Sequence, residues 1–484
     1  MRGAAERGLF PLCARMLLAA AAARRVDAQS YLMPVFFPKS YWTERWASSG
    51  KASHGIRATI LAAGLGRRLD PLTARLLPKP LFPLGGKVAI AEVWVRRMIE
   101  SGITDVTLNL CVLAHTIRRY FGDGAQYGVD LRYVEEHNPS GTLGGVCKQA
   151  LGNEARRLKP NEPGVGFARS GGATIIAPSG DIVTSFGPEL LAEMYEIHRK
   201  AGAAMTMVLT PIAPDRRKDF GTAVLGTKRR RRGPISISAQ VRSFIEKDPE
   251  SPSCLNNASI YMIESSLLAT LDRYRTEAKL DVDEPFYDFG KHVFPALLGK
   301  LPYVRLPKDH TLWGVQYDGP WFDVGNKRDY LLVNQHVLDG KVDVPLAYQR
   351  FPWGYLGSKV SINFSKVEIH PPVVIGNGCV IEAGAVLGPY AVIGDGWVIE
   401  HGAKIRDSVL WERYGYSPDG KTEISAADRV LVDRHEVRTG AQVTGSIIAG
   451  GTIQGEIREK TAEVLEDGQL SVLPIDQVPK GPRV

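Results

Sequence analysis

The chain has 484 residues, 44% of them hydrophobic and 23% charged, which is typical of a soluble globular protein with room for two or three domains. The net charge of +8 does not by itself indicate a nucleic-acid partner, because no long basic stripe is interleaved with aromatic residues. No apolar run approaches the roughly 18 residues that a membrane span needs. Five scattered cysteines without a C-x-x-C pair argue against a disulfide framework or a zinc site and fit a reducing cytoplasm.

Residues 1–55 predict no folded element, and we expect a flexible extension. An apolar stretch over residues 9–23 looks superficially like a signal peptide. However, Arg15 interrupts it, and Arg24-Arg25 stands where a small-residue cleavage site would be. An extension or a start further along the chain is therefore favoured over export.

Residues 56–345 are predicted to form one α/β domain, because short apolar strands alternate there with helical stretches. The run Ala58–Ala63 reads as a buried strand, and the glycines Gly64 and Gly66 follow it as a turn. Outward N–H groups of such a turn form a nest for phosphate oxygens. Arg68 and Lys79 add positive charge close by.

Helices and strands then alternate along this domain. The predicted helices cover 88–101, 115–121 and 189–201, and the predicted strands cover 105–110, 131–135, 173–177 and 204–210. Because ligands bind at the carboxyl ends of strands in open α/β sheets, Gly64 and Asp181 are expected to share one cleft. The basic run 228–232 is predicted to be an exposed hairpin tip.

The C-terminal third follows a six-residue period. This period predicts a triangular β-coil with stacked aliphatic residues inside, which we place over 360–460 and follow with a tail over 461–484. After a charged interruption, Ile447 and Ile453 are predicted to resume the phase. The repeating aliphatic residues are Ile369, Ile375, Ile381, Leu387, Ile393, Ile399 and Ile405.

The coil resembles the left-handed β-helix of hexapeptide-repeat proteins, many of which are acyltransferases. Here the coil is short and breaks between Trp411 and Ala441, and His370 and His401 are predicted to face outward. Packing and formation of a homo-oligomer are therefore the expected roles.

An ordered set of motifs resembles the sugar-phosphate nucleotidyltransferases, or nucleotide-sugar pyrophosphorylases. The string from Gly64 to Thr73 matches their G-x-G-x-R-L-x-P-L-T, and P-K-P-L follows at residues 78–81. The chain departs from the family pattern at Leu143 (for Ala), Ser179 (for Asn) and Ser259 (for Gly). Further matching segments are Glu136–Gly145, Ser179–Asp181, Phe220–Thr222, Phe244–Lys247, Asn257–Tyr261 and Trp321–Gly325.

This resemblance implies a Rossmann-like mixed sheet and a single reaction. A sugar 1-phosphate oxygen attacks the α-phosphorus of a nucleoside triphosphate, and pyrophosphate leaves. Such a displacement needs positioning and charge neutralisation more than acid–base chemistry. By resemblance, Arg68 would bind the triphosphate and Lys79 would lie near the α-phosphate, while Asp181 and Asp323 would hold Mg²⁺.

The resemblance also divides the site between nucleotide and sugar. Ser259 is expected to narrow the sugar pocket. The nucleotide would contact Ala63, Gly64, Gly66, Glu136 and Gly141. The sugar phosphate would contact Gly221, Glu246, Lys247 and Asn257.

Glu136 bears on the choice of base. A carboxylate only accepts hydrogen bonds, and guanine offers N–H donors at N1 and N2, so GTP is favoured. The segment Phe286–Pro295 also resembles mannose-1-phosphate guanylyltransferase-like members that carry a hexapeptide tail. The hypothesis is therefore GDP-mannose formation from GTP and mannose 1-phosphate.

Three alternatives stay open at this point. The first is a glucose-1-phosphate uridylyl-, thymidylyl- or adenylyltransferase. The second is a regulatory paralogue that binds nucleotide sugar without turnover, which loss of Arg68, Lys79, Asp181 or Asp323 would have indicated. The third is a fused acetyltransferase, which would predict a longer, uninterrupted coil.

Overall fold

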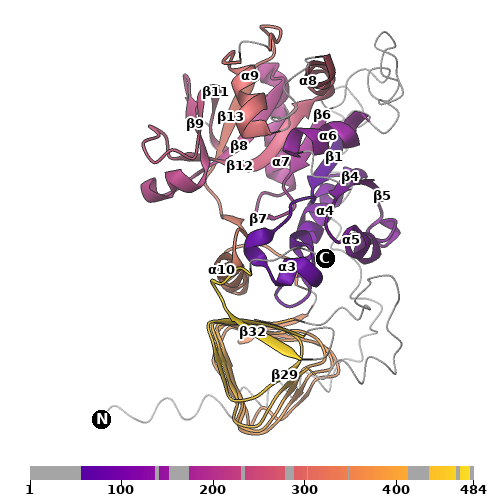
Figure 1. Cartoon of the computed structure of the whole chain (residues 1–484), viewed down its shortest axis with the longest axis vertical. Coiled ribbons are helices and arrows are strands. Elements are labelled where there is room, and N and C mark those ends of the chain that lie inside the picture. Colours follow the sequence, from indigo (N-terminus) through magenta and orange to yellow (C-terminus); the bar gives the residue numbers. More distant parts are fainter. Residues whose placement is uncertain are drawn as a thin grey trace.

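The computed structural model describes residues 56–136, 141–151, 174–230, 235–277, 288–301, 304–346, 348–411, 435–464 and 469–479. An α/β domain lies against a coil of triangular cross-section, which is seen end-on in Figure 1. The predicted extension 1–55 lies outside the described residues. None of the described helices is both long and apolar enough to cross a membrane. The four described cysteines form no disulfide with one another.

The α/β domain is built on one mixed sheet, as predicted, with the strand order β10-β11-β13-β8-β12-β6-β1-β4-β5. The pairs β1–β4, β1–β6, β4–β5 and β8–β13 are parallel, whereas β12 runs antiparallel to β6 and β8. β9 pairs with β11 and β12 beside this path. The strands are β1 (Ile56–Leu61), β4 (Asp105–Leu110), β5 (Asp130–Glu135), β6 (Thr174–Pro178), β8 (Met205–Pro211), β9 (Gly221–Leu225), β10 (Arg229–Arg230), β11 (Ile235–Glu246), β12 (Leu255–Glu264) and β13 (Leu312–Tyr317).

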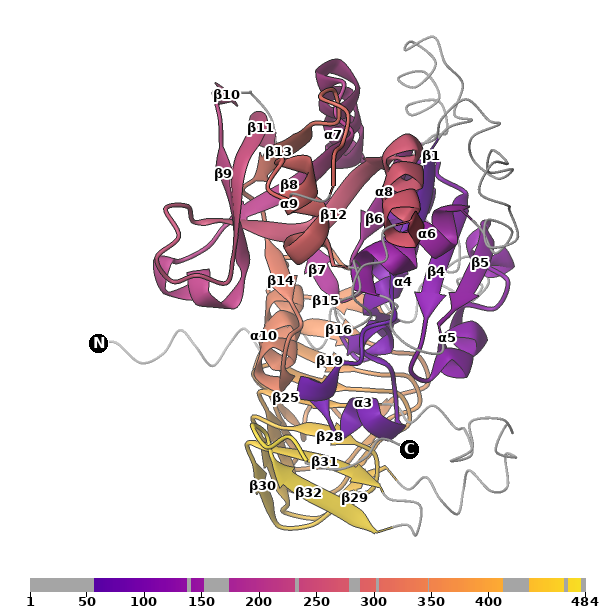
Figure 2. The same cartoon turned by 45° about the horizontal axis from the view of Figure 1, so that its top comes forward.

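Helices cover both faces of this sheet (Figure 2). One hydrophobic core includes Trp94 of α4 and Leu191 of α7. A second hydrophobic core includes Leu143 of α6 and Leu268 of α8. The helices are α3 (Leu72–Arg75), α4 (Ile90–Glu100), α5 (Ala114–Phe121), α6 (Gly141–Leu151), α7 (Pro188–Ala201), α8 (Ser265–Glu277), α9 (Phe294–Leu297) and α10 (Lys327–Leu338). Short 3₁₀ helices cover Arg67–Leu69, Lys79–Leu81, Ala125–Tyr127 and Pro214–Asp219, and a π-helical turn covers Phe289–Val293.

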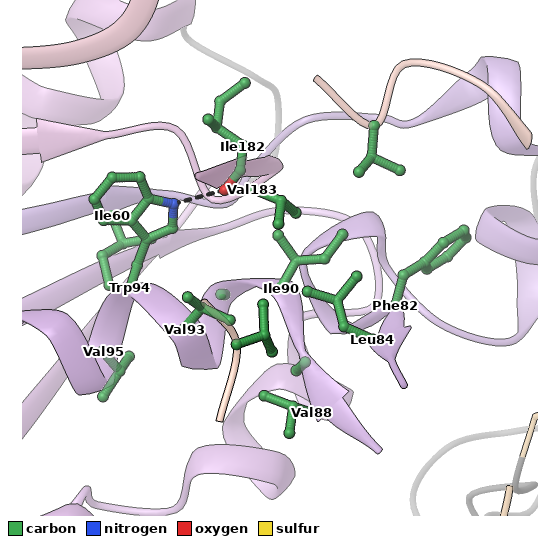
Figure 3. Close-up of a cluster of buried hydrophobic side chains, with 14 of the residues drawn as sticks. Ile60, Phe82, Leu84, Val88, Ile90, Val93, Trp94, Val95, Ile182 and Val183 are labelled. Atoms are coloured by element: carbon green, nitrogen blue, oxygen red, sulfur yellow. Dashed lines mark hydrogen bonds between the residues drawn. The ribbon is translucent and has the colours of Figure 1, made fainter. Parts of the chain in front are cut away.

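Two short antiparallel strand pairs complete the domain. β2 (Pro83–Leu84) pairs with β3 (Val88–Ala89), and β7 (Ile182–Thr184) pairs with β14 (Trp321–Asp323). The helix predicted from residue 88 therefore begins at Ile90, because its first two residues form β3. The Trp94 indole N–H of α4 donates to the Ile182 carbonyl oxygen at 2.9 Å, which ties α4 to β7 inside the core (Figure 3).

The predicted basic hairpin tip is described only in part. β10 pairs antiparallel with β11, and Lys228 and Arg229 are exposed. Residues 231–234 lie outside the described residues.

The C-terminal part is the predicted three-sided parallel β-coil. Its first sheet is β15 (Gln349–Phe351), β16 (Gly354–Leu356), β19 (Val373–Ile375), β22 (Ala391–Ile393), β25 (Ser408–Leu410), β28 (Ile447–Ala449), β31 (Lys460–Val464) and β32 (Leu470–Pro474). The second is β17 (Ser361–Ile362), β20 (Val380–Ile381), β23 (Val398–Ile399), β26 (Glu436–Val437) and β29 (Thr452–Ile453). The third is β18 (Glu368–Ile369), β21 (Val386–Leu387), β24 (Lys404–Arg406), β27 (Gln442–Thr444) and β30 (Glu456–Arg458).

The aliphatic residues of the six-residue period fill the coil interior as predicted, and His370 and His401 are exposed. The prediction for Ile447 is wrong. Leu410 pairs with Ile448, so Ile448 points inward and Ile447 packs into the core of the α/β domain. The reason is that the corner between Val443 and Ile447, like the one at Asp407 with which it pairs, is one residue shorter than the corner after Leu387, so the next inward residue follows Val443 by five positions rather than six. Ile453 is inside the coil as predicted.

One face of the coil packs against the α/β domain. Val374, Val392 and Ile447 of the first sheet belong to the same hydrophobic core as Trp94. Trp411 Nε1 donates to the Tyr330 hydroxyl oxygen at 2.9 Å, next to the place where α10 lies against β25 (Figure 2). β31 crosses the tail boundary predicted at 460, and β32 folds back antiparallel on it.

Candidate active site

The turn after β1 is held open toward solvent by its own hydrogen bonds. Gly66 has a φ of 60°, a conformation that glycine adopts without strain. The Thr73 hydroxyl lies 2.9 Å from the Gly66 carbonyl oxygen and 2.7 Å from Asp70 Oδ1. We call Gly64–Thr73 the signature turn. It leaves Gly64 and Arg68 exposed at the end of the sheet.

Lys79 lies between the two aspartates predicted to hold a metal. Its Nζ is 2.6 Å from Asp181 Oδ2 and 3.3 Å from Asp323 Oδ1. β6 leads to Asp181 and β14 ends at Asp323, and β14 pairs with β7 directly after Asp181. Ser179 Oγ donates to Asp181 Oδ1 at 2.5 Å, so the serine that replaces asparagine orients this carboxylate.

The three charges set one another's pKa values. Burial disfavours the charged form of Lys79, but the two carboxylates outweigh it and hold the pKa of Lys79 above its usual value. Burial likewise works against ionised Asp181, yet the contact with Lys79 holds the pKa of Asp181 below its usual value. Burial and the charge of Asp181 raise the pKa of Asp323. One ammonium thus faces two carboxylates and offsets the charge of only one of them.

Arg68 reaches the same place from the signature turn. A Cβ on Gly325 would lie 3.2 Å from Arg68 Nη2, so the guanidinium lies over the backbone two residues after Asp323. Its positive charge acts on the carboxylates of both Asp323 and Asp329. The side chain is exposed and therefore accessible to a ligand.

A cavity of about 200 Å³ opens between the signature turn and the start of α6. It brings together six of the predicted residues, namely Ala63, Gly64, Lys79, Glu136, Gly141 and Asp181. Gly66, Arg68 and Asp323 lie outside this lining, although Arg68 is near enough for its charge to act on Asp323.

Sequence reasoning missed Asn109, which also lines the cavity. Its Oδ1 accepts from the Ala62 N–H at 2.6 Å, and its Nδ2 donates to Glu136 Oε1 at 3.1 Å. A Cβ on Gly145 would lie 2.5 Å from this nitrogen, so only glycine allows α6 to approach so closely. The available signal was an amide inside the otherwise apolar end of a predicted strand. Thr142 in the lining was missed as well.

The predicted sugar residues lie apart from this cavity, on β9, β11 and β12. A Cβ on Gly221 would lie 2.6 Å from Glu246 Oε2, and one on Gly290 would lie 2.7 Å from the same oxygen. The Glu246 carboxylate is thus held between two glycines, and burial raises its pKa. Lys247 follows with an exposed side chain.

Asn257 lies where the register of β12 breaks. Its Nδ2 donates to the Tyr261 hydroxyl at 2.8 Å, and Ser259 has a φ of 57°. The Ser259 carbonyl accepts from the Ser179 N–H at 2.9 Å. β12 is therefore fixed to the segment that carries Asp181.

The α/β domain that carries this site matches a known protein family. Residues 57–340, more than half of the chain, match the family model described as nucleotidyl transferase. The chain belongs to the nucleotidyl transferase family. The matched segment runs from the second residue of β1 past the end of α10. For a nucleotidyl transferase, a cavity lined by glycines and flanked by Lys79 and Arg68 is suited to a phosphorylated ligand.

Three relatives are similar over most of their own length. A UTP–glucose-1-phosphate uridylyltransferase of Synechocystis is 28% identical over 80% of this chain and 90% of its own. A mannose-1-phosphate guanylyltransferase of Mycobacterium tuberculosis is 27% identical over 70% of this chain and 78% of its own. The probable mannose-1-phosphate guanylyltransferase 1 of Oryza sativa is 26% identical over 69% and 80%.

Proposed function

We propose that this nucleotidyl transferase joins a nucleoside triphosphate to a sugar 1-phosphate, giving a nucleotide sugar and pyrophosphate, with GTP and mannose 1-phosphate as its substrates. The observation that carries the proposal is the cluster of Lys79, Asp181 and Asp323 at the edge of a glycine-lined cavity. Two of the three relatives named above are mannose-1-phosphate guanylyltransferases, which supports the choice of pair.

Mg²⁺ fits the donor set at this cluster. Asp181 and Asp323 both approach a single nitrogen, so their oxygens converge on a place that already accepts positive charge. Within the described ranges, no group of three or more His, Cys, Asp or Glu residues gathers for a metal. Two carboxylates are enough for Mg²⁺, which completes its shell with water and substrate phosphate oxygens. When bound, the ion would neutralise charge on the phosphates that react.

The chain's own residues would supply position and charge. The backbone from Ala63 to Gly66 would hold phosphate oxygens, and Arg68 would bind the pyrophosphate as it leaves. Lys79 would turn from the carboxylates to the α-phosphate, where negative charge increases during the displacement. The sugar 1-phosphate oxygen forms its new bond to the α-phosphorus as the bond to pyrophosphate breaks. No proton needs to move at the reacting atoms.

Base selection is assigned to Glu136. It is 3% exposed, lines the cavity and accepts from Asn109 Nδ2, which fixes its orientation. A fixed carboxylate suits the two adjacent N–H donors of guanine at N1 and N2, whereas uracil and thymine offer it a single N–H donor at N3. On the sugar side, Gly221, Glu246, Lys247 and Asn257 are assigned to the sugar phosphate.

A uridylyl transfer to glucose 1-phosphate is the second candidate, because of the 28% identity to the Synechocystis enzyme. A regulatory paralogue is disfavoured because Arg68, Lys79, Asp181 and Asp323 are all present and lie together. Self-association through the coil is a further proposal, which light scattering tests.

The test is pyrophosphate release with Mg²⁺ across GTP, UTP, dTTP, ATP and CTP, each paired with mannose, glucose and N-acetylglucosamine 1-phosphates. Fastest turnover with GTP and mannose 1-phosphate is expected. Fastest turnover with another pair would retain the reaction and overturn the role of Glu136. Binding of nucleotide sugars without release from any pair would support the regulatory paralogue.

A further inference from the structure

We propose that the C-terminal end of the chain is a positioning element for the signature turn, and that it acts through Lys327. The relevant part of the tail is the turn 474–477, which we call the tail turn. The kinetic consequence rests on the function proposed above, whereas the physical coupling does not.

Lys327 connects the two turns directly. Its Nζ donates to the Asp70 carbonyl oxygen at 2.8 Å and to the Gln477 carbonyl oxygen at 2.6 Å. The side chain is only 2% exposed, although it begins α10 just four residues after Asp323. Burying an ammonium is costly unless it is hydrogen-bonded and faces negative charge, so these contacts are required rather than incidental. Burial lowers the pKa of Lys327, and the carboxylates of Asp476, Asp70 and Glu463 offset part of that effect.

The tail turn is fixed independently of Lys327. Ile475 is 2% exposed in the core of the α/β domain, and its N–H donates to the Glu459 carbonyl oxygen at 2.9 Å. Arg328 donates to both oxygens of Asp476, at 2.7 and 2.6 Å. This planar two-bond contact holds the tail turn at a defined distance from α10. Gln477 therefore presents its carbonyl to Lys327 from a rigid support.

The signature turn is supported on the other side of Lys327. Asp70 follows the single turn Arg67–Leu69, and the Asp70 N–H donates to the Arg67 carbonyl oxygen at 3.2 Å. The Thr73 hydroxyl contacts Asp70 and Gly66. Holding the Asp70 carbonyl thus holds the short segment from which Arg68 extends. The tail turn, which follows β32 of the coil, thus limits the movement of Arg68, the residue that would bind the triphosphate.

Two variants test this coupling in the full-length protein. Lys327→Met keeps most of the buried stem and removes the ammonium, and Asp476→Ala releases the tail turn while leaving Lys327 in place. Lys341→Met is the matched control, because Lys341 follows the other end of α10 and pairs there with Asp339. Hydrogen exchange is measured over peptide 66–77, with β4 (Asp105–Leu110) as an internal reference. The KM for each substrate is measured with the best pair from the substrate screen.

Lys327→Met is expected to speed exchange of peptide 66–77 and to raise the KM for the nucleoside triphosphate about ten-fold, because small displacements of binding groups are costly. The KM for the sugar 1-phosphate and exchange in β4 should stay unchanged. Asp476→Ala should act in the same direction, and Lys341→Met should change neither. Loss of folded protein alone would lower the active fraction, but it would not raise the KM for the triphosphate while leaving the KM for the sugar 1-phosphate unchanged.

Unchanged exchange over 66–77 in both variants would overturn the proposal, and so would faster exchange with an unchanged KM for the triphosphate. If the wild-type protein releases no pyrophosphate from any pair, the function proposed above has failed. The exchange experiment then decides the coupling, with the Kd for each triphosphate replacing its KM.

Discussion

The ammonium nitrogen of Lys79 lies 2.6 Å from Asp181 Oδ2, in the same place where the carboxylate of Asp323 approaches it. These residues come from three segments that are 102 and 142 positions apart along the chain. A divalent cation at the proposed site would need the same carboxylate oxygens as the ammonium. Binding of one would then displace the other.

Lys79→Met should show this competition. Turnover is expected to fall about 10²- to 10³-fold, because a charge directed at the reacting phosphate is lost. In the absence of nucleotide, Mn²⁺ should bind the variant more tightly than the wild type, as measured by electron paramagnetic resonance. Lys366→Met, on an exposed position of the coil, is the control. Equal or weaker Mn²⁺ binding in Lys79→Met would contradict the shared site.

Asp323→Asn should abolish metal-dependent turnover, with a loss of about 10²-fold or more, because a neutral amide is a weaker ligand for a hard cation. Chelation of the wild type should stop pyrophosphate release, and added Mg²⁺ should restore it. Asp318→Asn is the matched control, since Asp318 is exposed and its carboxylate accepts a hydrogen bond from the nearby Gln316 side chain. Full activity of Asp323→Asn would remove Asp323 from the metal site.

Glu136→Gln should weaken the preference for GTP. The variant keeps the size of the side chain but replaces an acceptor by a mixed donor and acceptor, so the KM for GTP is expected to rise about 10-fold or more. The same change at Glu135, which pairs with Arg118 on the surface, is the control. Steady-state kinetics with GTP and UTP measure the effect. An unchanged ratio of kcat/KM for the two triphosphates would show that Glu136 does not read the base.

Asp395→Asn should weaken docking of the coil in a pH-dependent way. Asp395 accepts from Lys87 Nζ at 2.5 Å and from the Tyr348 hydroxyl at 2.8 Å, so it joins the coil to the α/β domain. Burial opposes its ionisation, but these contacts hold the pKa of Asp395 below its usual value of 3.8. The stabilisation is therefore complete above about pH 4 and is lost as the pH falls through the folded-state pKa.

At pH 7 the Asp395→Asn variant should lose about 2 kcal/mol in the free energy of unfolding, measured with urea. The difference from the wild type should shrink below pH 4, because protonated Asp395 resembles the amide. Asp309→Asn, at an exposed site, should show no such dependence. A difference that is constant with pH would contradict the assigned ion pair.

Ile447 and Ile448 are adjacent but belong to different cores. Each change to alanine should cost about 2–4 kcal/mol, because both side chains are fully buried. Hydrogen exchange should separate them. Ile447→Ala should loosen β28 against the α/β domain and leave β27 and β30 protected, whereas Ile448→Ala should expose the coil strands on both sides. The reverse pattern would restore the phase predicted from the sequence.

Much of the fold followed from local patterns. The six-residue period predicted the coil, and the alternation of strands and helices predicted an α/β domain with most boundaries within one residue. The period could not show that the corner at Asp407 is one residue shorter. The interruption that follows Trp411 contains no repeats, so the change in spacing cannot be recognised there. The helix predicted from Val88 began later because Val88 and Ala89 pair with β2 in a short hairpin, and this pairing competes with helix formation.

The sequence by itself determined the chemistry available to this protein, since a glycine turn, two cations and two aspartates in a fixed order are properties of the chain. The tertiary structure decided how they combine. It placed Lys79 between Asp181 and Asp323, put Asn109 behind Glu136, and linked Asp70 to Gln477 through Lys327. These contacts join residues tens to hundreds of positions apart. They depend on which strands become neighbours in the sheet and on how the coil packs against it, and local propensities do not encode either.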